Sequence, residues 1–160
     1  MMTPDPGPDR PTVRLRPKAE ARAIRLGFPW VYADELVTDR RTQAMAPGTL
    51  AVLEDAERKA LGLVTVNPGS KIIARMLDPD PAATINEDWL AHRLSRALAL
   101  RTRLYDAPFY RLIHAEADGL PGVVIDRFGD IAVFWKSFWN VVQSTLVMCY
   151  DWRWKESCFF

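Results

Sequence analysis

The chain has 160 residues, of which 49% are hydrophobic and 26% are charged, and its formal net charge is +1. This length allows one domain or two small ones. The near-neutral charge excludes a basic surface over the whole molecule, so any nucleic-acid-binding region has to be local. The N-terminus has neither the basic start nor the apolar segment of a secretory signal. We therefore expect a cytoplasmic protein whose first residues, 1–11, form a disordered arm.

The first half of the chain predicts a small β-rich domain over residues 12–78. Residues 12–16 alternate between polar and apolar side chains, which predicts a strand. Residues 18–27 predict a short helix that ends at Gly27. Three longer strands, joined by short turns, are predicted at 49–55, 60–67 and 71–77. Strands of this length and spacing favour a small barrel or a curled sheet.

A second unit is predicted over residues 86–134. Two Asp-Pro pairs precede it, and residues 79–85 are the expected linker. Residues 86–106 carry apolar side chains at helical spacing, and either Thr84 with Glu87 or Asn86 alone can cap this helix. Strands are predicted at 110–114, 123–126 and 130–134. The predicted fold class is therefore α+β, with a small β-barrel followed by an incomplete α+β unit.

Residues 114–130, HAEADGLPGVVIDRFGD, predict turns on either side of a buried strand. The Asp-Gly and Pro-Gly pairs suit tight turns. Glu116, Asp118 and Asp126 could suggest acid–base catalysis, but the chain offers no nucleophile with a partnered base. We therefore interpret this stretch as a rigid scaffold and assign no catalytic residue.

Positive charge is concentrated in two stretches. Residues 10–25 hold six Arg or Lys against one Glu, and residues 93–111 hold five Arg against one Asp. Exposed arginines are often merely solubilising, but the planar guanidinium also binds phosphate well. We predict RNA contacts for Arg14, Arg16, Lys18, Arg22, Arg25 and Arg75. Trp30 could stack on a base, although a Trp in an apolar run is more typical of a core.

The composition changes abruptly near residue 134. From 135 to 160 there is no Ala, Pro or Gly, and this tail holds four of the six Trp and both Cys. Three interpretations compete: a membrane or partner anchor, an aromatic core segment, or out-of-frame or foreign translation after a truncation. Several polar residues within 131–150 argue against a membrane span. We expect the third interpretation to hold. The two Cys and two His lack the spacing of a zinc site, so no metal is expected.

The stretch at 110–130, YRLIHAEADGLPGVVIDRFGD, resembles a signature of class I S-adenosylmethionine-dependent methyltransferases that modify cytosine C5 in 23S ribosomal RNA. Residues 14–36 resemble the opening of that family, and residues 60–77 resemble its strand–turn–strand segment. The resemblance covers roughly residues 13–134. It implies an N-terminal PUA domain that binds RNA, a small α+β domain, and a Rossmann-like domain that binds S-adenosylmethionine and carries the chemistry.

The Rossmann-like domain of that family has no counterpart in this sequence. No Gly occurs after Gly129, so the Gly-rich loop that approaches a nucleotide cofactor is missing. Cys149 and Cys158 lie in the tail, and neither is assigned as the nucleophile that C5 methylation needs. We expect the N-terminal fragment of a ribosomal RNA methyltransferase, one that binds RNA, holds no cofactor and is inactive alone.

Two alternatives remain open at this point. The chain could be a stand-alone PUA-type RNA-binding module whose aromatic C-terminus docks a partner. It could also be a small membrane-associated protein anchored by residues 131–150. The sequence does not indicate the oligomeric state.

Overall fold

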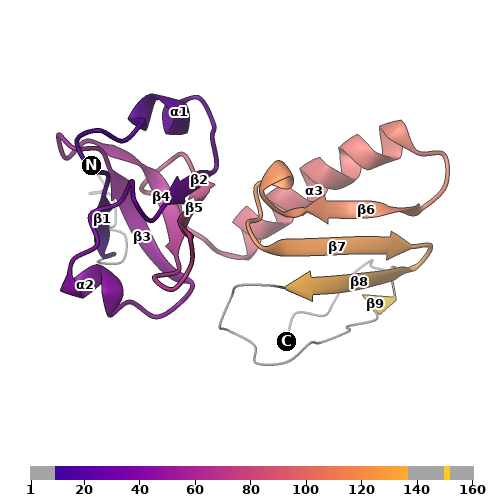
Figure 1. Cartoon of the computed structure of the whole chain (residues 1–160). Coiled ribbons are helices and arrows are strands. Elements are labelled where there is room, and N and C mark those ends of the chain that lie inside the picture. The colour runs from indigo at the N-terminus through magenta and orange to yellow at the C-terminus, as the bar shows by residue number, and fades with distance from the viewer. Residues whose placement is uncertain (1–9, 137–149, 152–160) are drawn as a thin grey trace, which may run out of the picture. The chain divides into compact units, whose positions relative to one another are not determined.

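The computed structural model describes residues 10–136 and 150–151. The chain divides between Ile85 and Asn86 into two compact units. The N-terminal unit runs from indigo to magenta in Figure 1, and the C-terminal unit runs from salmon pink through orange to yellow. The α+β class expected from the sequence is confirmed.

The N-terminal unit is a five-stranded sheet with two short helices. Its strands follow one another in space in the order β1-β3-β4-β5-β2. Strand β1 runs parallel to β3, and the other neighbours are antiparallel. The elements are β1 (Thr12–Arg14), α1 (Ala21–Arg25), β2 (Trp30–Tyr32), α2 (Arg40–Gln43), β3 (Thr49–Glu54), β4 (Ala60–Val66) and β5 (Ile72–Asp78).

This sheet is curled, because its two edges are joined. Strands β1 and β2 lie at opposite edges, and Leu15, just after β1, forms a bridge with Leu36, which follows β2. On either side of that bridge, the backbone N–H of Arg16 donates to the carbonyl of Glu35 at 2.7 Å, and that of Val37 donates to Arg14 at 2.8 Å. Edge N–H and C=O groups that would otherwise be free are thereby paired.

The core of the N-terminal unit lies inside the curl. Strand β4 is buried at every residue from Leu61 to Val66, whereas β3 alternates and buries Ala51 and Leu53 completely. Helix α1 contributes a single buried side chain, Ile24. Of its other residues, Arg22 and Arg25 are exposed, whereas Ala21 and Ala23 are half-buried.

The C-terminal unit packs one long helix on a small antiparallel sheet of order β6-β7-β8-β9. Asn86 caps the helix, since its Oδ1 accepts from the backbone N–H of Trp89 at 2.9 Å. Ala97 on the helix packs with Tyr110, Ile113 and Ile125 of the sheet. The elements are α3 (Glu87–Leu104), β6 (Phe109–His114), the 3₁₀ turn η1 (Ala115–Asp118), β7 (Val123–Phe128), β8 (Ile131–Lys136) and β9 (Tyr150–Asp151).

Three details of the N-terminal unit differ from the sequence-based expectation. Helix α1 spans only Ala21–Arg25, and α2 was not predicted. The expected disordered arm, 1–11, is wrong for its last two residues. The guanidinium of Arg10 donates to the carbonyl of Ala83 at 3.0 Å, and the carbonyl of Pro11 accepts from Val52 at 2.9 Å. The second of these bonds joins Pro11 to β3.

Most of the aromatic tail, including both Cys, lies outside the described residues. The foreign origin expected for 135–160 and the alternative of a partner-docking C-terminus therefore concern mainly residues outside the described ranges. Trp135 and Lys136 do belong to β8, where they pair with Val124 and Val123. The sheet therefore continues two residues past the point at which the composition changes. Among the helices of the described ranges, none has the length and apolar composition needed to cross a membrane.

Candidate nucleic-acid interface

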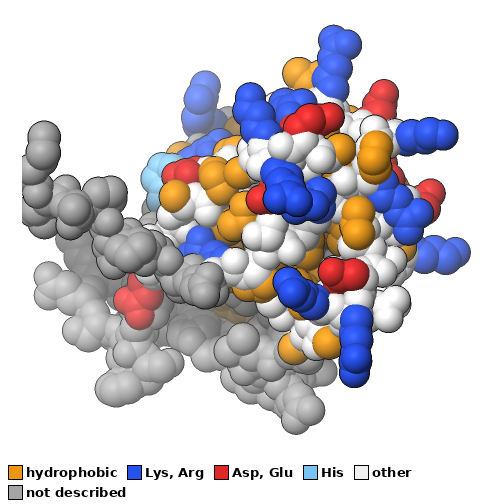
Figure 2. Space-filling model, turned by 90° about the vertical axis from the view of Figure 1, so that its left-hand side faces the viewer, with side chains coloured by type: hydrophobic (Ala, Val, Ile, Leu, Met, Phe, Trp, Pro, Cys, Tyr) orange, Lys and Arg blue, Asp and Glu red, His pale blue; other side chains and the backbone are white. Residues whose placement is uncertain are grey.

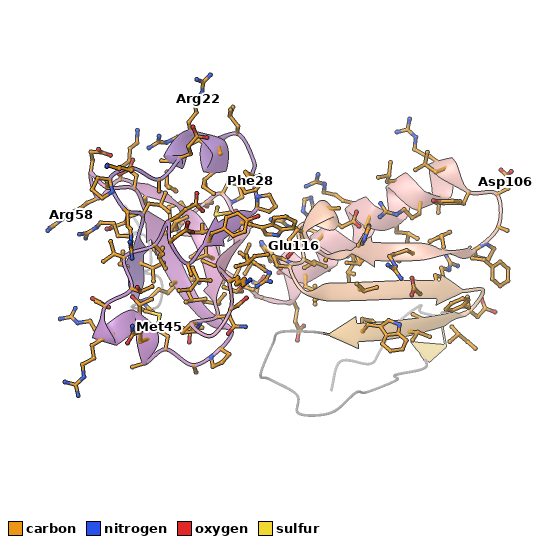
Figure 3. The ribbon with its side chains drawn as sticks, in the orientation of Figure 1. Arg22, Phe28, Met45, Arg58, Asp106 and Glu116 are labelled. Carbon is orange, nitrogen blue, oxygen red and sulfur yellow. The ribbon has the colours of Figure 1, made fainter. Side chains whose placement is uncertain are left out.

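Helix α1 and the turn before it present cations to solvent. Lys18 and Arg22 are exposed, and neither forms an ion pair with another described residue. In Figure 3, Arg22 projects from α1 away from the sheet. Figure 2 shows Lys and Arg side chains spread across the described part of one face, with acidic and hydrophobic side chains between them. Lys18 and Arg22 can therefore meet a phosphate group without first breaking an existing contact.

Arg14 and Arg16 lie two residues apart at the β1 edge of the sheet, but they differ in their hydrogen-bond partners. The Nε of Arg16 donates to the carbonyl of Leu36 at 2.9 Å, which holds the exposed side chain in place while its Nη1 and Nη2 bond no described residue. The Nη2 of Arg14 lies 3.2 Å from Glu54 Oε2 on the neighbouring strand. The charge of Arg14 is therefore largely offset, whereas that of Arg16 is available.

Arg25 forms an ion pair with Asp55, whose side chain is only 4% exposed. Asp55 also accepts from the backbone N–H of Lys59 at 2.9 Å and from that of Glu57 at 3.1 Å. The Lys59 N–H is the main cause that lowers the pKa of Asp55, and the positive charge of Arg25 adds to it. Arg25 therefore ties α1 to the turn between β3 and β4, which is a structural role.

Arg75 is the least accessible of the six predicted RNA-contact residues, at 9% exposure. It lies in β5, beside Trp30 of β2 and Thr65 of β4, and its Nη1 donates to the carbonyl of Ile72 at 3.2 Å. The structure brings Arg16, Lys18 and Arg22 onto one exposed segment around α1. It places Arg75 within the sheet.

A pocket of about 260 Å³ opens beside α1, within the N-terminal unit. Phe28 and Trp30 line it with their rings in an edge-to-face contact, 5.9 Å between centroids. Two carboxylates, Glu20 and Glu35, lie on the same lining. The Nε1 of Trp30 is buried and has no hydrogen-bond acceptor among the described residues. An unpaired buried donor is uncommon and calls for an explanation.

The sequence analysis did not single out Glu20, Phe28 or Glu35, which line this pocket, as candidate site residues. The run Gly-Phe-Pro-Trp at 27–30 could have indicated aromatic side chains held beside a turn, because Gly and Pro restrict the backbone there. The two carboxylates had no such signal. They lie 15 residues apart in sequence and line the same pocket only in the folded chain.

Asp118, within the stretch 114–130, has a structural role, as the sequence analysis predicted. It accepts from Arg101 Nη1 at 3.0 Å and Nη2 at 2.7 Å, and from the backbone N–H of His114 at 2.7 Å. The carboxylate therefore ties α3 to the turn η1. Gly119, which follows, adopts a left-handed conformation with φ of +71°.

Three of the five arginines in the second Arg-rich stretch are engaged in contacts within their own unit, whereas Arg96 and Arg103 are exposed. Arg101 pairs with Asp118, Arg111 pairs with Asp126 at 2.9 Å, and Arg93 lies over the ring of Trp89 at 4.7 Å. This stretch is therefore a weaker candidate for RNA contact than the segment around α1. The described part of the chain contains no group of three His, Cys, Asp or Glu side chains that could hold a metal ion.

Residues 13–79 match the family model of the PUA-like domain. The N-terminal unit is thus a PUA-like domain, a curled β-sheet module. Over about three quarters of its length the chain is also similar to the N-terminal part of ribosomal RNA large subunit methyltransferases. The similarity to ribosomal RNA methyltransferases that the motifs predicted is confirmed.

The similarity to these relatives is moderate in identity and partial in coverage. A ribosomal RNA large subunit methyltransferase of Deinococcus radiodurans is 35% identical over 136 residues, which cover 80% of this chain and 33% of that protein. Ribosomal RNA large subunit methyltransferase I of Alteromonas mediterranea is 36% identical over 124 residues, covering 76% and 30%. The chain spans about a third of the length of the curated relatives it matches.

A solved structure shares the fold. A chain described as an S-adenosylmethionine-dependent methyltransferase, from Streptococcus mutans, superposes with a TM-score of 0.64 at 17% identity. The match covers 79% of this chain and 33% of that one. At this identity the likeness supports the fold of the two units and carries no statement about activity.

Proposed function

We propose that the N-terminal unit binds RNA through Arg16, Lys18 and Arg22, called here the α1 cation group. The main support is that these three side chains are exposed and form no ion pair with the described residues. They belong to a unit that matches the PUA-like domain. Phosphate contacts of this kind supply sequence-independent affinity and fix the position of an RNA on the protein.

The other three predicted residues, Arg14, Arg25 and Arg75, are less available for direct contact with RNA. Arg14 and Arg25 are held by Glu54 and Asp55, so their charges add to the local potential more than to direct contacts. Arg75, at 9% exposure, would need a local rearrangement before it could touch an RNA.

We propose large-subunit ribosomal RNA as the partner and the cytoplasm as the place of binding. The relatives are named as methyltransferases of that RNA, and the similarity covers the PUA-like domain. In this proposal the described residues position the RNA, while methyl transfer from S-adenosylmethionine to cytosine C5 belongs to the part of the longer relatives that this chain does not match.

Two double variants with equal loss of charge test the α1 cation group. Lys18→Ala with Arg22→Ala removes two of its members, and Arg40→Ala with Arg41→Ala removes two exposed cations from α2. Binding of a fluorescently labelled RNA hairpin is measured by anisotropy at one salt concentration. The first variant should bind clearly more weakly than the second. Equal affinities of the two variants would contradict the proposed surface.

A further inference from the structure

The sheet of the C-terminal unit has one face covered by α3 and one face that no described helix covers. Tyr110, Ile113 and Ile125 are buried with Ala97 of the helix, so they point toward the covered side. Side chains alternate along a strand, so every second residue of β7 and β8 points to the opposite side, called here the open face. The strand register aligns its residues in rows across β6, β7 and β8, and the two outer rows are Phe109–Phe128–Ile131 and His114–Val124–Trp135.

The aromatic side chains of the open face are accessible to solvent. Phe109 is 65% exposed, and Phe128 and Trp135 are each 53% exposed. Single exposed apolar side chains are ordinary on a protein surface, whereas several on one face mark a binding site. Phe109 and Phe128 stand directly opposite each other on adjacent strands, which places their Cβ atoms about 5 Å apart. These two rings therefore form one aromatic position at the end of the sheet.

A second aromatic position lies at the other end of the open face. Trp135 shares its row with Val124 and with the exposed His114, whose ring can also stack on a base. Val124 is four residues from Phe128 along β7, which corresponds to about 13 Å in a strand. The exposed rings are therefore divided between two ends of the face, and each end can receive a flat ring system.

An ion pair stands between the two aromatic positions. The Nε and Nη2 of Arg111 donate to the two carboxylate oxygens of Asp126 at 2.9 and 3.2 Å, across β6 and β7. The side chain of Arg111 is 47% exposed and that of Asp126 only 19%, and the Nη1 of Arg111 bonds no described residue. The more accessible charge at the centre of the face is therefore the cation, which can donate to a phosphate oxygen.

We propose that the open face is a second RNA site, which binds single-stranded RNA by stacking its bases on the exposed rings. One base stacks on Phe109 and Phe128, another stacks on Trp135, and Arg111 donates to the backbone between them. Protein interfaces have an apolar centre depleted of charge, whereas the centre of this face is an ion pair with an accessible cation. Bases paired in a double helix are not free to stack on side chains, so the site selects single strands. This proposal goes beyond the α1 cation group and does not depend on it.

The test uses the complete 160-residue chain and two labelled RNA oligomers of equal length and charge, one of adenosines and one of abasic residues. We expect the adenosine oligomer to bind about tenfold more tightly, because stacking of one base provides a factor of this order. The double variant Phe109→Ala with Phe128→Ala should remove most of this advantage and leave the abasic oligomer unaffected. The matched control is Leu100→Ala with Leu104→Ala, two exposed apolar residues of α3, which should keep the advantage.

The double variant Lys18→Ala with Arg22→Ala separates the two proposals. It should weaken both oligomers by a similar factor and keep the advantage of adenosine, since the two oligomers carry the same charge. Equal affinity of the unaltered chain for both oligomers would overturn the open-face site and leave the α1 cation group standing. If the chain also self-associates, and loss of the Phe109 and Phe128 rings abolishes that association, the face is a contact between copies instead. The comparison between oligomers needs no variant, so it decides the matter even if a variant fails to fold.

Discussion

Arg101 holds Asp118 with both arms of its guanidinium, Nη1 at 3.0 Å from Oδ1 and Nη2 at 2.7 Å from Oδ2. Both side chains are largely buried, at 13% and 9% exposure. The same Arg101 donates through Nε to the carbonyl of Arg111 at 3.1 Å, and Asp118 accepts the backbone N–H of His114. This pair therefore connects the last turns of α3 to β6 and η1, and it fixes how the helix lies on the sheet.

Removing one partner of this pair should destabilise the C-terminal unit strongly. Asp118→Ala leaves a buried guanidinium without its counter-charge, which typically costs about 3–5 kcal/mol of unfolding free energy. The matched control is Asp126→Ala, because its partner Arg111 is 47% exposed and the loss should be much smaller. Hydrogen exchange resolved along the chain measures the effect. Equal protection of α3 in the two variants would show that the pair is dispensable.

Gly62 in β4 should tolerate no side chain. Its φ is +148°, and a Cβ added there would stand 2.5 Å from the carbonyl oxygen of Asp78 and 2.7 Å from Met76 Cε. Gly62→Ala should cost about 1–3 kcal/mol through overpacking and backbone strain. The control is Gly69→Ala, whose Cβ would meet nothing within 4 Å. Thermal unfolding followed by circular dichroism compares them, and an equal melting temperature would contradict this assignment.

The N-terminal unit should lose stability in acid through Asp55. The pKa of this carboxyl is lowered in the folded chain, chiefly by the Lys59 N–H and further by Arg25. A lowered pKa means that the stabilisation is complete above the ordinary aspartate pKa of about 3.9 and declines as the pH falls below it. Asp55→Asn should therefore be less stable at pH 7 and show a smaller further loss between pH 5 and pH 2.5. Urea unfolding at several pH values tests this, and parallel curves for both proteins would contradict it.

Much of the fold follows from local sequence signals. The strands at 49–55, 60–67 and 71–77 were predicted to within a residue or two, because alternation and turn residues are local features. Helix α1 is shorter than predicted, since only Ile24 is anchored in the core. The turn role of Asp118 was foreseen, but its partner was not. Arg101 lies 17 residues away, and only the packing of α3 on β6 brings the two together.

The sequence indicates the cations of the candidate site, but it does not indicate the acidic residues with which some of them pair. Five of the six predicted cations stand out in the sequence by local excess, and that criterion cannot distinguish a solvated side chain from a paired one. Arg25 and Arg14 meet Asp55 and Glu54 across 30 and 40 residues of sequence. Trp30 was weighed between core and base stacking. It is half-buried, and its unpaired N–H becomes visible only with coordinates.

The dependence of RNA affinity on salt tests the central claim most directly. Anisotropy titrations of the labelled hairpin at several salt concentrations give the slope of log affinity against log salt for the unaltered chain and for the two double variants. Removing a cation that binds one phosphate should reduce the slope by about 1, so Lys18→Ala with Arg22→Ala should lower it by about 2. Arg40→Ala with Arg41→Ala should leave the slope nearly unchanged. Equal slopes for all three proteins would contradict an RNA-binding surface at α1.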